Sequence, residues 1–263
     1  MKFFQALVIV IGLLFLRRIS KGLLGEFYYS NVGDAISDAL TQGIIIFVVW
    51  RILKEKRIDF FPTKTVSKEV VIHASLVIFF LFLMIIIVGG FEDLYRRGSV
   101  EFFKQQFIFG WSDTMVKYFI GALFIGPIFE ELLFNGILLR NFLREYSVTL
   151  SIILTVLIFT SFHFGQGEVD FLITDKIAIV ALSSFSAWLV IKTSNIKLSI
   201  CLHFFWNLLN YLFPLVISII GLNLKDPTVF SVFSVISVMI SAFLLTRNFK
   251  RLRSALIGAE YTN

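Results

Sequence analysis

The strongest constraint on the fold is a series of apolar runs, each about as long as a helix that crosses a bilayer. Residues 74–90, for example, contain no charged side chain, and a transmembrane helix needs about 20 mostly apolar residues. Hydrophobic residues make up 57% of the 263-residue chain and charged residues 16%, which is too little polar surface for a soluble domain of this length. The runs are continuous and do not alternate, which excludes a membrane β-barrel. The sequence therefore predicts an all-α, polytopic membrane helical bundle.

We expect about eight transmembrane helices. The expected spans are residues 3–19, 35–53, 68–90, 114–144, 148–165, 174–192, 195–214 and 228–246. The first span resembles a signal peptide, but it lacks a small-residue cleavage site, so we expect a retained helix and leave open whether it crosses the whole membrane. The chain then divides into an N-terminal part with helices one to three (1–113), a core with helices four to seven (114–214), and a last helix with a basic cytoplasmic tail (215–263).

The distribution of basic residues predicts the orientation. An even number of helices puts both termini on one side, and the loops of that side hold most of the 24 Lys and Arg residues. Loops rich in Lys and Arg stay in the cytoplasm, so both termini should be cytoplasmic. The net charge of +6 then reflects orientation and contact with lipid headgroups, and we expect no nucleic-acid partner. The single cysteine, Cys201, excludes an internal disulfide framework.

Few polar side chains fall at bilayer depth. They are Glu130, Glu131, His163, His203 and Asn207. A charged residue there costs ~2.5–3.5 kcal/mol on insertion scales, so such residues usually mark function or pair with one another. The third histidine, His73, lies near a helix start and is expected at the membrane interface.

The expected helix ends place these side chains at similar heights. Glu130 and His163 lie at nearly equal distances before and after a turn expected near Tyr146, which puts both ~24 Å from that turn. His203 is ~12 Å beyond the turn near Asn195, and Glu130 is ~15 Å from the membrane boundary expected at Arg140. Since the polar segment 165–170 places His163 near the end of its own span, the match requires the hairpin tip to protrude into the cytoplasm and that segment to fold inward.

Two local patterns suggest how these groups are used. Adjacent helical residues are rotated by about 100°, so Glu130 can face a water molecule while Glu131 supports a neighbouring helix. Pro127 should loosen the backbone just before them. His203 and Asn207 are one turn apart and share a helix face, where they can bind a metal or water and donate to an oxyanion. Interhelical hydrogen bonding would explain that pair equally well.

Three short motifs resemble those of the CPBP family, the intramembrane peptidases related to type II CAAX prenyl endopeptidases and to bacteriocin-processing Abi proteins. The family pattern EExxxR is matched by Glu130-Glu131, with Asn135 at the arginine position. FxxxH is matched by Phe159 to His163, and HxxxN by His203 to Asn207. The resemblance covers about residues 114–214, with each motif on its own expected helix.

The resemblance implies a function and a role for each residue. The chain would be an intramembrane endopeptidase that hydrolyses a membrane-associated peptide or protein precursor, in a bacterial cell membrane. Glu130 would be the general base and His163 would hold the water, with Glu131 in support. His203 and Asn207 would polarise the scissile carbonyl and stabilise the oxyanion. The family is described either as zinc-dependent, which would make Glu130, His163 and His203 ligands of Zn²⁺, or as a metal-free glutamate type.

Two other functions stay open at this point. Asn135 in place of the arginine is compatible with a catalytically impaired protein that acts by binding, as in bacteriocin immunity. A transporter with a Glu/His proton relay is the third possibility, although no inverted repeat or second broken helix is visible. A Cys201 nucleophile is disfavoured, because Cys201 lies about 200° around the helix from His203. The substrate and the oligomeric state are not determined by the sequence.

Overall fold

The computed structural model describes residues 62–97, 118–164, 173–220 and 227–260, together with eleven single positions before residue 52. Its helices are α3 (Lys68–Arg97), η1 (Tyr118–Ile125), α6 (Gly126–Glu131), η2 (Leu132–Leu138), α7 (Leu139–Phe142), α8 (Val148–Phe164), α9 (Ile173–Thr193), α10 (Ile196–Ile220) and α11 (Pro227–Glu260). Within these ranges the only β-pairing is an isolated bridge between Thr63 and Asn195. The predicted all-α class is thereby confirmed.

The helix ends lie close to the predicted ones, with one large difference. α11 continues past the expected end at residue 246 to Glu260, so the basic segment expected as a tail is helical. The expected spans 3–19 and 35–53 lie outside the described residues except at single helical positions. The predicted count of eight includes these two spans.

Among the described residues, three helices are long and apolar enough to cross a membrane. These are Lys68–Glu92 in α3, Ile173–Thr193 in α9 and Phe230–Gly258 in α11, while Val148–His163 in α8 is a shorter apolar helix. Their length and composition support an integral membrane protein.

The chain forms two compact units. The first comprises Met1–Lys64, Phe109–Gly167 and Ser183–Phe204, and the second comprises Thr65–Ile108, Glu168–Leu182 and Phe205–Asn263. The first unit contains both glutamates and two of the histidines singled out in the sequence.

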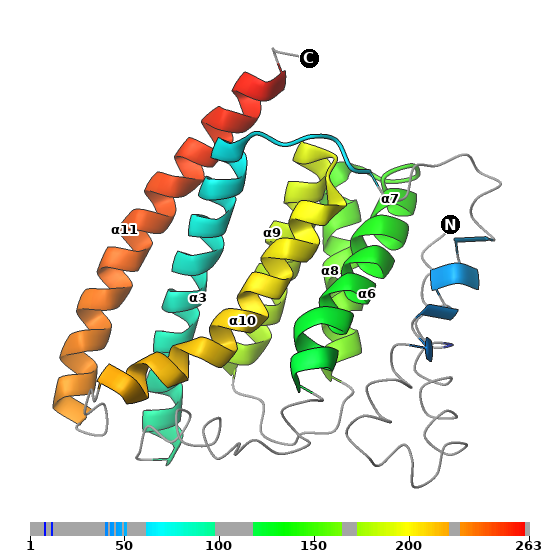
Figure 1. The fold of residues 1–263 in the computed structure, drawn as a ribbon. Helices are drawn as coiled ribbons and strands as arrows, with labels where there is room; N and C mark the ends of the chain where they lie inside the picture. The colour runs from blue at the N-terminus through cyan, green and yellow to red at the C-terminus, as the bar shows by residue number, and fades with distance from the viewer. Residues whose placement is uncertain are drawn as a thin grey trace, which may run out of the picture. The chain divides into compact units, whose positions relative to one another are not determined.

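A helical hairpin is the main feature of the first unit. η1, α6, η2 and α7 follow one another without interruption from residue 118 to 142, and α8 returns after a short turn (Figure 1). The turn is closed by the backbone N–H of Tyr146, which donates to the Phe142 carbonyl at 2.8 Å, so the turn predicted near Tyr146 is confirmed. Phe134 packs edge-on against Phe159 of α8, with ring centroids 4.9 Å apart. This contact holds the glutamate-bearing helix against α8.

In the second unit, α3 and α11 run side by side along their length (Figure 1). Gly90 makes their close approach possible, because a Cβ atom at this position would lie 2.5 Å from the Phe230 ring. The Glu92 carboxylate accepts hydrogen bonds from the backbone N–H groups of Ile173 at 2.8 Å and Thr174 at 3.0 Å. It thereby satisfies the first amides of α9, which have no partner within their own helix.

Candidate active site

The backbone that carries the two glutamates is unusual. α6 is a short α-helical stretch between two π-helical stretches, η1 and η2. In η2 the bonding is widened, as seen where the N–H of Leu139 donates to the carbonyl of Phe134, five residues back. Such π-helical stretches occur often at functional sites. Pro127 lies at the start of α6, so the predicted loosening takes the form of a widened helix that remains continuous.

Glu130 meets two histidines that come from other helices. Its Oε2 atom lies 3.6 Å from Nε2 of His163 and 3.7 Å from Nε2 of His203. These distances are too long for direct hydrogen bonds, and they leave room for a small group that all three side chains contact. The Glu130 side chain is 17% exposed. α6, α8 and α10 thus bring one carboxylate and two imidazoles together, although His163 lies in the last turn of α8.

In both imidazoles a contact at Nδ1 sets the orientation of the ring. Nδ1 of His163 lies 2.8 Å from the Phe159 carbonyl oxygen, which can only accept, so this Nδ1 carries a hydrogen and donates. Nδ1 of His203 lies 3.0 Å from Oε1 of Glu131, where an ionised carboxylate likewise accepts. Each ring therefore turns Nε2 toward Glu130. Such partners fix ring orientation at metal and catalytic sites.

Glu131 points in a different direction from Glu130, as the 100° rotation predicts, and it is almost fully buried (2% exposed). Its Oε2 atom accepts hydrogen bonds from Asn135 Nδ2 at 2.6 Å, Ser186 Oγ at 2.8 Å and Ser199 Oγ at 2.5 Å. A buried carboxylate is tolerated when its oxygens are hydrogen-bonded in this way. Glu131 therefore links α6 to α9 and α10 and holds His203.

Ser186 and Ser199 are the residues that the sequence did not single out. Both are buried, and their hydroxyl groups also contact each other. They are uncharged serines in apolar helices, so no charge at bilayer depth marked them.

The contacts described for Glu130, Glu131 and the two histidines do not include Asn207. It follows His203 by one turn on α10 and is half-buried, but it belongs to the second unit. Its role at the oxyanion remains a prediction. Cys201 is exposed whereas His203 is buried, in line with their predicted positions on opposite sides of the helix.

The donor set suits zinc chemically. Two imidazole nitrogens and a carboxylate are common zinc ligands, and bonds of 2.0–2.1 Å at tetrahedral angles put neighbouring ligand atoms about 3.3 Å apart. Within the described ranges no group of three or more His, Cys, Asp or Glu side chains is placed so that it could hold a metal ion. The two separations from Glu130 exceed the tetrahedral edge by a few tenths of an ångström, so the residue types suit zinc but the side chains as placed do not form a metal site.

Comparison with known families gives an independent result. Residues 111–209 match the family model described as Rce1-like, the type II CAAX prenyl endopeptidases. This segment is an Rce1-like domain. The match confirms the resemblance drawn from the three motifs, all of which fall inside the matched range. No match to the chain was found among curated proteins or among solved structures. An Rce1-like domain is a peptidase domain, and its substrates are peptides or proteins.

Proposed function

We propose that this chain is an intramembrane endopeptidase that hydrolyses a peptide bond in a membrane-associated peptide or protein precursor. The observation that carries the proposal is the convergence of Glu130 Oε2 on Nε2 of His163 and Nε2 of His203. A carboxylate facing two oriented imidazoles at a partly buried position can activate a water molecule, which is the first requirement of peptide hydrolysis.

The chemistry assigns one task to each side chain. Glu130 takes a proton from a water held between its Oε2 and His163, and the water oxygen attacks the scissile carbonyl carbon. The Glu131 carboxylate stabilises His203 as an imidazolium, whose Nε2–H then donates to the developing oxyanion. Such a donor typically contributes ~3–4 kcal/mol to the transition state. Glu130 then returns the proton to the leaving amine, so the cycle is balanced.

A metal-dependent route uses the same residues. A zinc ion would be held by Glu130 Oε2 and by Nε2 of His163 and His203, and it would supply an activated water and a Lewis acid. Zinc analysis of the purified protein, combined with cleavage assays after chelation, separates the two routes. Cleavage that survives complete removal of zinc supports the metal-free glutamate mechanism.

The test of the function is cleavage of precursor peptides by purified protein in lipid nanodiscs. We expect Glu130→Gln to lower kcat by about 10²–10⁴-fold, the usual contribution of general acid–base catalysis. Cys201→Ser is the control, because Cys201 is exposed and lies on the other side of α10 from His203. Full activity of Glu130→Gln would overturn the proposal.

A binding protein without catalysis is the second candidate, and its support is the neutral Asn135 at the motif arginine. The same variant separates the two candidates. A cellular phenotype, such as immunity to a bacteriocin, that persists unchanged in Glu130→Gln would favour binding. The Asn135 amide donates to Glu131 at 2.6 Å, which is compatible with an intact site and so favours the enzyme.

A further inference from the structure

The environment of Glu131 differs from what its sequence motif suggests. An arginine four residues after the glutamate would supply a cation, but Asn135 supplies a neutral amide. Within the described part of the chain His203 is the ion-pair partner of Glu131, and the three donors at Oε2 are the uncharged Asn135, Ser186 and Ser199. They come from η2, α9 and α10. Three neutral hydrogen-bond donors therefore contact the Glu131 carboxylate where the motif would supply one cation.

Each serine hydroxyl is a separate restraint on the Glu131 carboxylate. Ser186 and Ser199 both donate to Glu131 Oε2, and the two hydroxyl groups also contact each other. Asn135 Nδ2 adds a hydrogen bond to Ser186 Oγ at 3.0 Å. Loss of either hydroxyl leaves two donors at Oε2 and removes one of the contacts that fix the direction of the Glu131 carboxylate. We expect the carboxylate of such a variant to adopt additional orientations.

Rotation of Glu131 would act on His203. Oε1 of Glu131 holds Nδ1 of this imidazole at 3.0 Å, and that bond determines where Nε2 points. We infer that Ser186 and Ser199 are positioning residues that lock Glu131, and through it His203, in place of the motif arginine. The inference rests on the proposed peptidase function for its kinetic consequence, whereas its structural consequence for His203 is independent of that function.

The kinetic test compares serine variants with a matched control. We expect Ser186→Ala and Ser199→Ala each to lower kcat by about tenfold or more, with KM nearly unchanged, because His203 acts on the transition state. Ser186→Thr and Ser199→Thr keep the hydroxyl and should restore most of the activity. Ser151→Ala is the control, since Ser151 is a fully buried serine of the same unit whose hydroxyl has no hydrogen-bond partner among the described residues.

A second readout needs no activity. The ¹⁵N chemical shifts of the His203 ring report the protonation and hydrogen bonding of its two nitrogens, and we expect a single form in the wild type and a mixture in Ser199→Ala. An active wild type whose serine variants keep both kcat and the His203 spectrum would overturn the inference alone. An inactive wild type with the expected change in the spectrum would overturn the peptidase proposal and leave the positioning role standing.

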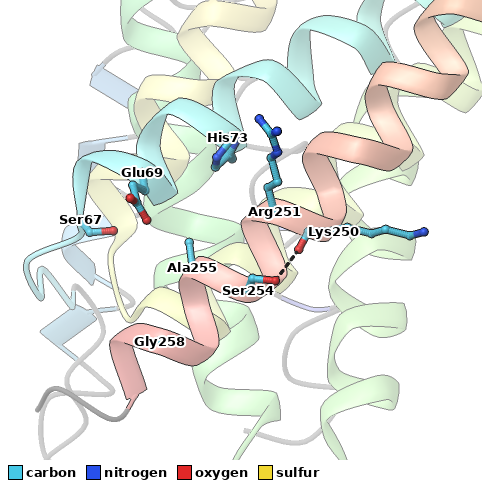
Figure 2. Close-up of a pocket in the computed structure, with 8 residues that line it drawn as sticks. All are labelled: Ser67, Glu69, His73, Lys250, Arg251, Ser254, Ala255 and Gly258. Carbon is cyan, nitrogen blue, oxygen red and sulfur yellow. Dashed lines mark hydrogen bonds between the residues drawn. The ribbon is translucent and has the colours of Figure 1, made fainter.

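A separate observation concerns the second unit, where a groove of 670 Å³ lies between the start of α3 and the end of α11 (Figure 2). It is lined by Ser67, Glu69, His73, Lys250, Arg251, Ser254, Ala255 and Gly258. The Arg251 side chain extends beside His73, whereas Lys250 extends outward from the rim, and the small Ala255 and Gly258 leave space near the helix end. The groove therefore combines two exposed cations with the single carboxylate of Glu69.

These cations are available to a ligand. Neither Lys250 nor Arg251 forms an ion pair with another residue in the part of the chain that the structure describes. The groove also lies where α11 changes from an apolar to a basic helix, at Arg247. Ile72, which lies beside His73 and next to the apolar part of α3, is 55% exposed. A ligand with a phosphate and hydrocarbon chains matches this combination.

We propose that the groove binds the phosphate of an anionic phospholipid headgroup, held by the Arg251 guanidinium with Lys250 at the rim, while the acyl chains lie along Ile72 toward the apolar part of α3. Basic pockets between transmembrane helices bind such headgroups, and a guanidinium recognises phosphate through two parallel hydrogen bonds. The flanking apolar surface favours a lipid over a soluble phosphate.

The test uses native mass spectrometry and thermal melting of the full chain. In nanodiscs of phosphatidylglycerol and phosphatidylcholine we expect retention of phosphatidylglycerol and a higher Tm as its share rises. Lys250→Gln/Arg251→Gln should lose both effects. Lys64→Gln/Lys197→Gln removes the same charge from exposed positions outside the groove and should keep them. Equal retention by the two double variants would overturn the proposal, and so would an equal rise of Tm with inorganic phosphate alone, which would identify a soluble ligand.

Discussion

At the scale of single residues, the two adjacent glutamates have opposite relations to their surroundings. Glu130 faces two imidazoles at 3.6 and 3.7 Å, whereas Oε2 of Glu131 is bonded to three donors within 2.8 Å. The first arrangement suits a group that reacts, and the second suits a group that holds the structure. Two neighbouring carboxylates of one helix therefore have surroundings that suit two different purposes.

Matched Gln substitutions should separate these purposes. Glu131→Gln puts an amide against the hydrogen-bond donors of Glu131, and we expect it to destabilise the fold by about 2–4 kcal/mol, as breaking a buried polar network does. Glu130→Gln should stay folded with a nearly unchanged Tm while losing cleavage. Thermal melting in detergent measures the first effect and peptide cleavage the second. A Glu131→Gln protein that melts like the wild type would contradict this assignment.

Asn135 gives a second test at this scale. Asn135→Asp would put a second buried carboxylate 2.6 Å from Glu131 in place of a donor, and we expect a loss of stability of about 3 kcal/mol or more at neutral pH. The loss should shrink as the pH falls, because protonation of either carboxyl group restores a donor between them. Asn141→Asp, at a buried asparagine of α7, measures the pH-dependent loss that burial of a carboxylate causes by itself. Melting curves at several pH values would show whether the effect is larger at residue 135, where a second carboxylate is adjacent.

At the scale of elements, the apolar helices differ in the acceptors to which their serine and threonine hydroxyl groups donate hydrogen bonds. In α8, Ser161 donates to the Leu157 carbonyl and Thr155 to the Ser151 carbonyl, each four residues back in the same helix. This is the usual solution for such residues in apolar helices. Ser186 of α9 and Ser199 of α10 donate to Glu131 on another element instead. Hydroxyl groups of this second kind join helices.

The contact between α3 and α11 provides a prediction for these two elements. A Cβ atom at Gly90 would lie 2.5 Å from the Phe230 ring, so we expect Gly90→Ala to cost about 1–3 kcal/mol, as overpacking usually does. Phe230→Leu in the same chain should recover part of the loss by making room. Gly258→Ala is the control, because a Cβ atom at Gly258 would have no neighbouring atom within 4 Å. Additive effects of Gly90→Ala and Phe230→Leu would contradict the contact.

At the scale of the whole molecule, the predicted orientation remains to be measured. The basic residues near the turn after α7, the connection before α10 and the end of α11 are predicted to lie in the cytoplasm. We therefore expect a fluorescent protein fused to the C-terminus to be fluorescent in the cytoplasm, and alkaline phosphatase fused there to be inactive. The reverse pattern would mean that the number of transmembrane helices is odd or that the orientation is inverted.

The sequence by itself determined the class of fold, most helix positions, the turn near Tyr146 and the identity of the polar residues in apolar helices. These depend on composition and on spacing along one helix, which are local properties. The tertiary structure decided which of these groups meet. Glu130 lies beside His163 even though the latter is in the last turn of its helix, and two ordinary serines complete the surroundings of Glu131. The sequence does not distinguish a serine that hydrogen-bonds within its own helix from one that hydrogen-bonds to another helix. The partner of a hydroxyl group depends on how the helices pack and not on the neighbouring residues in the chain.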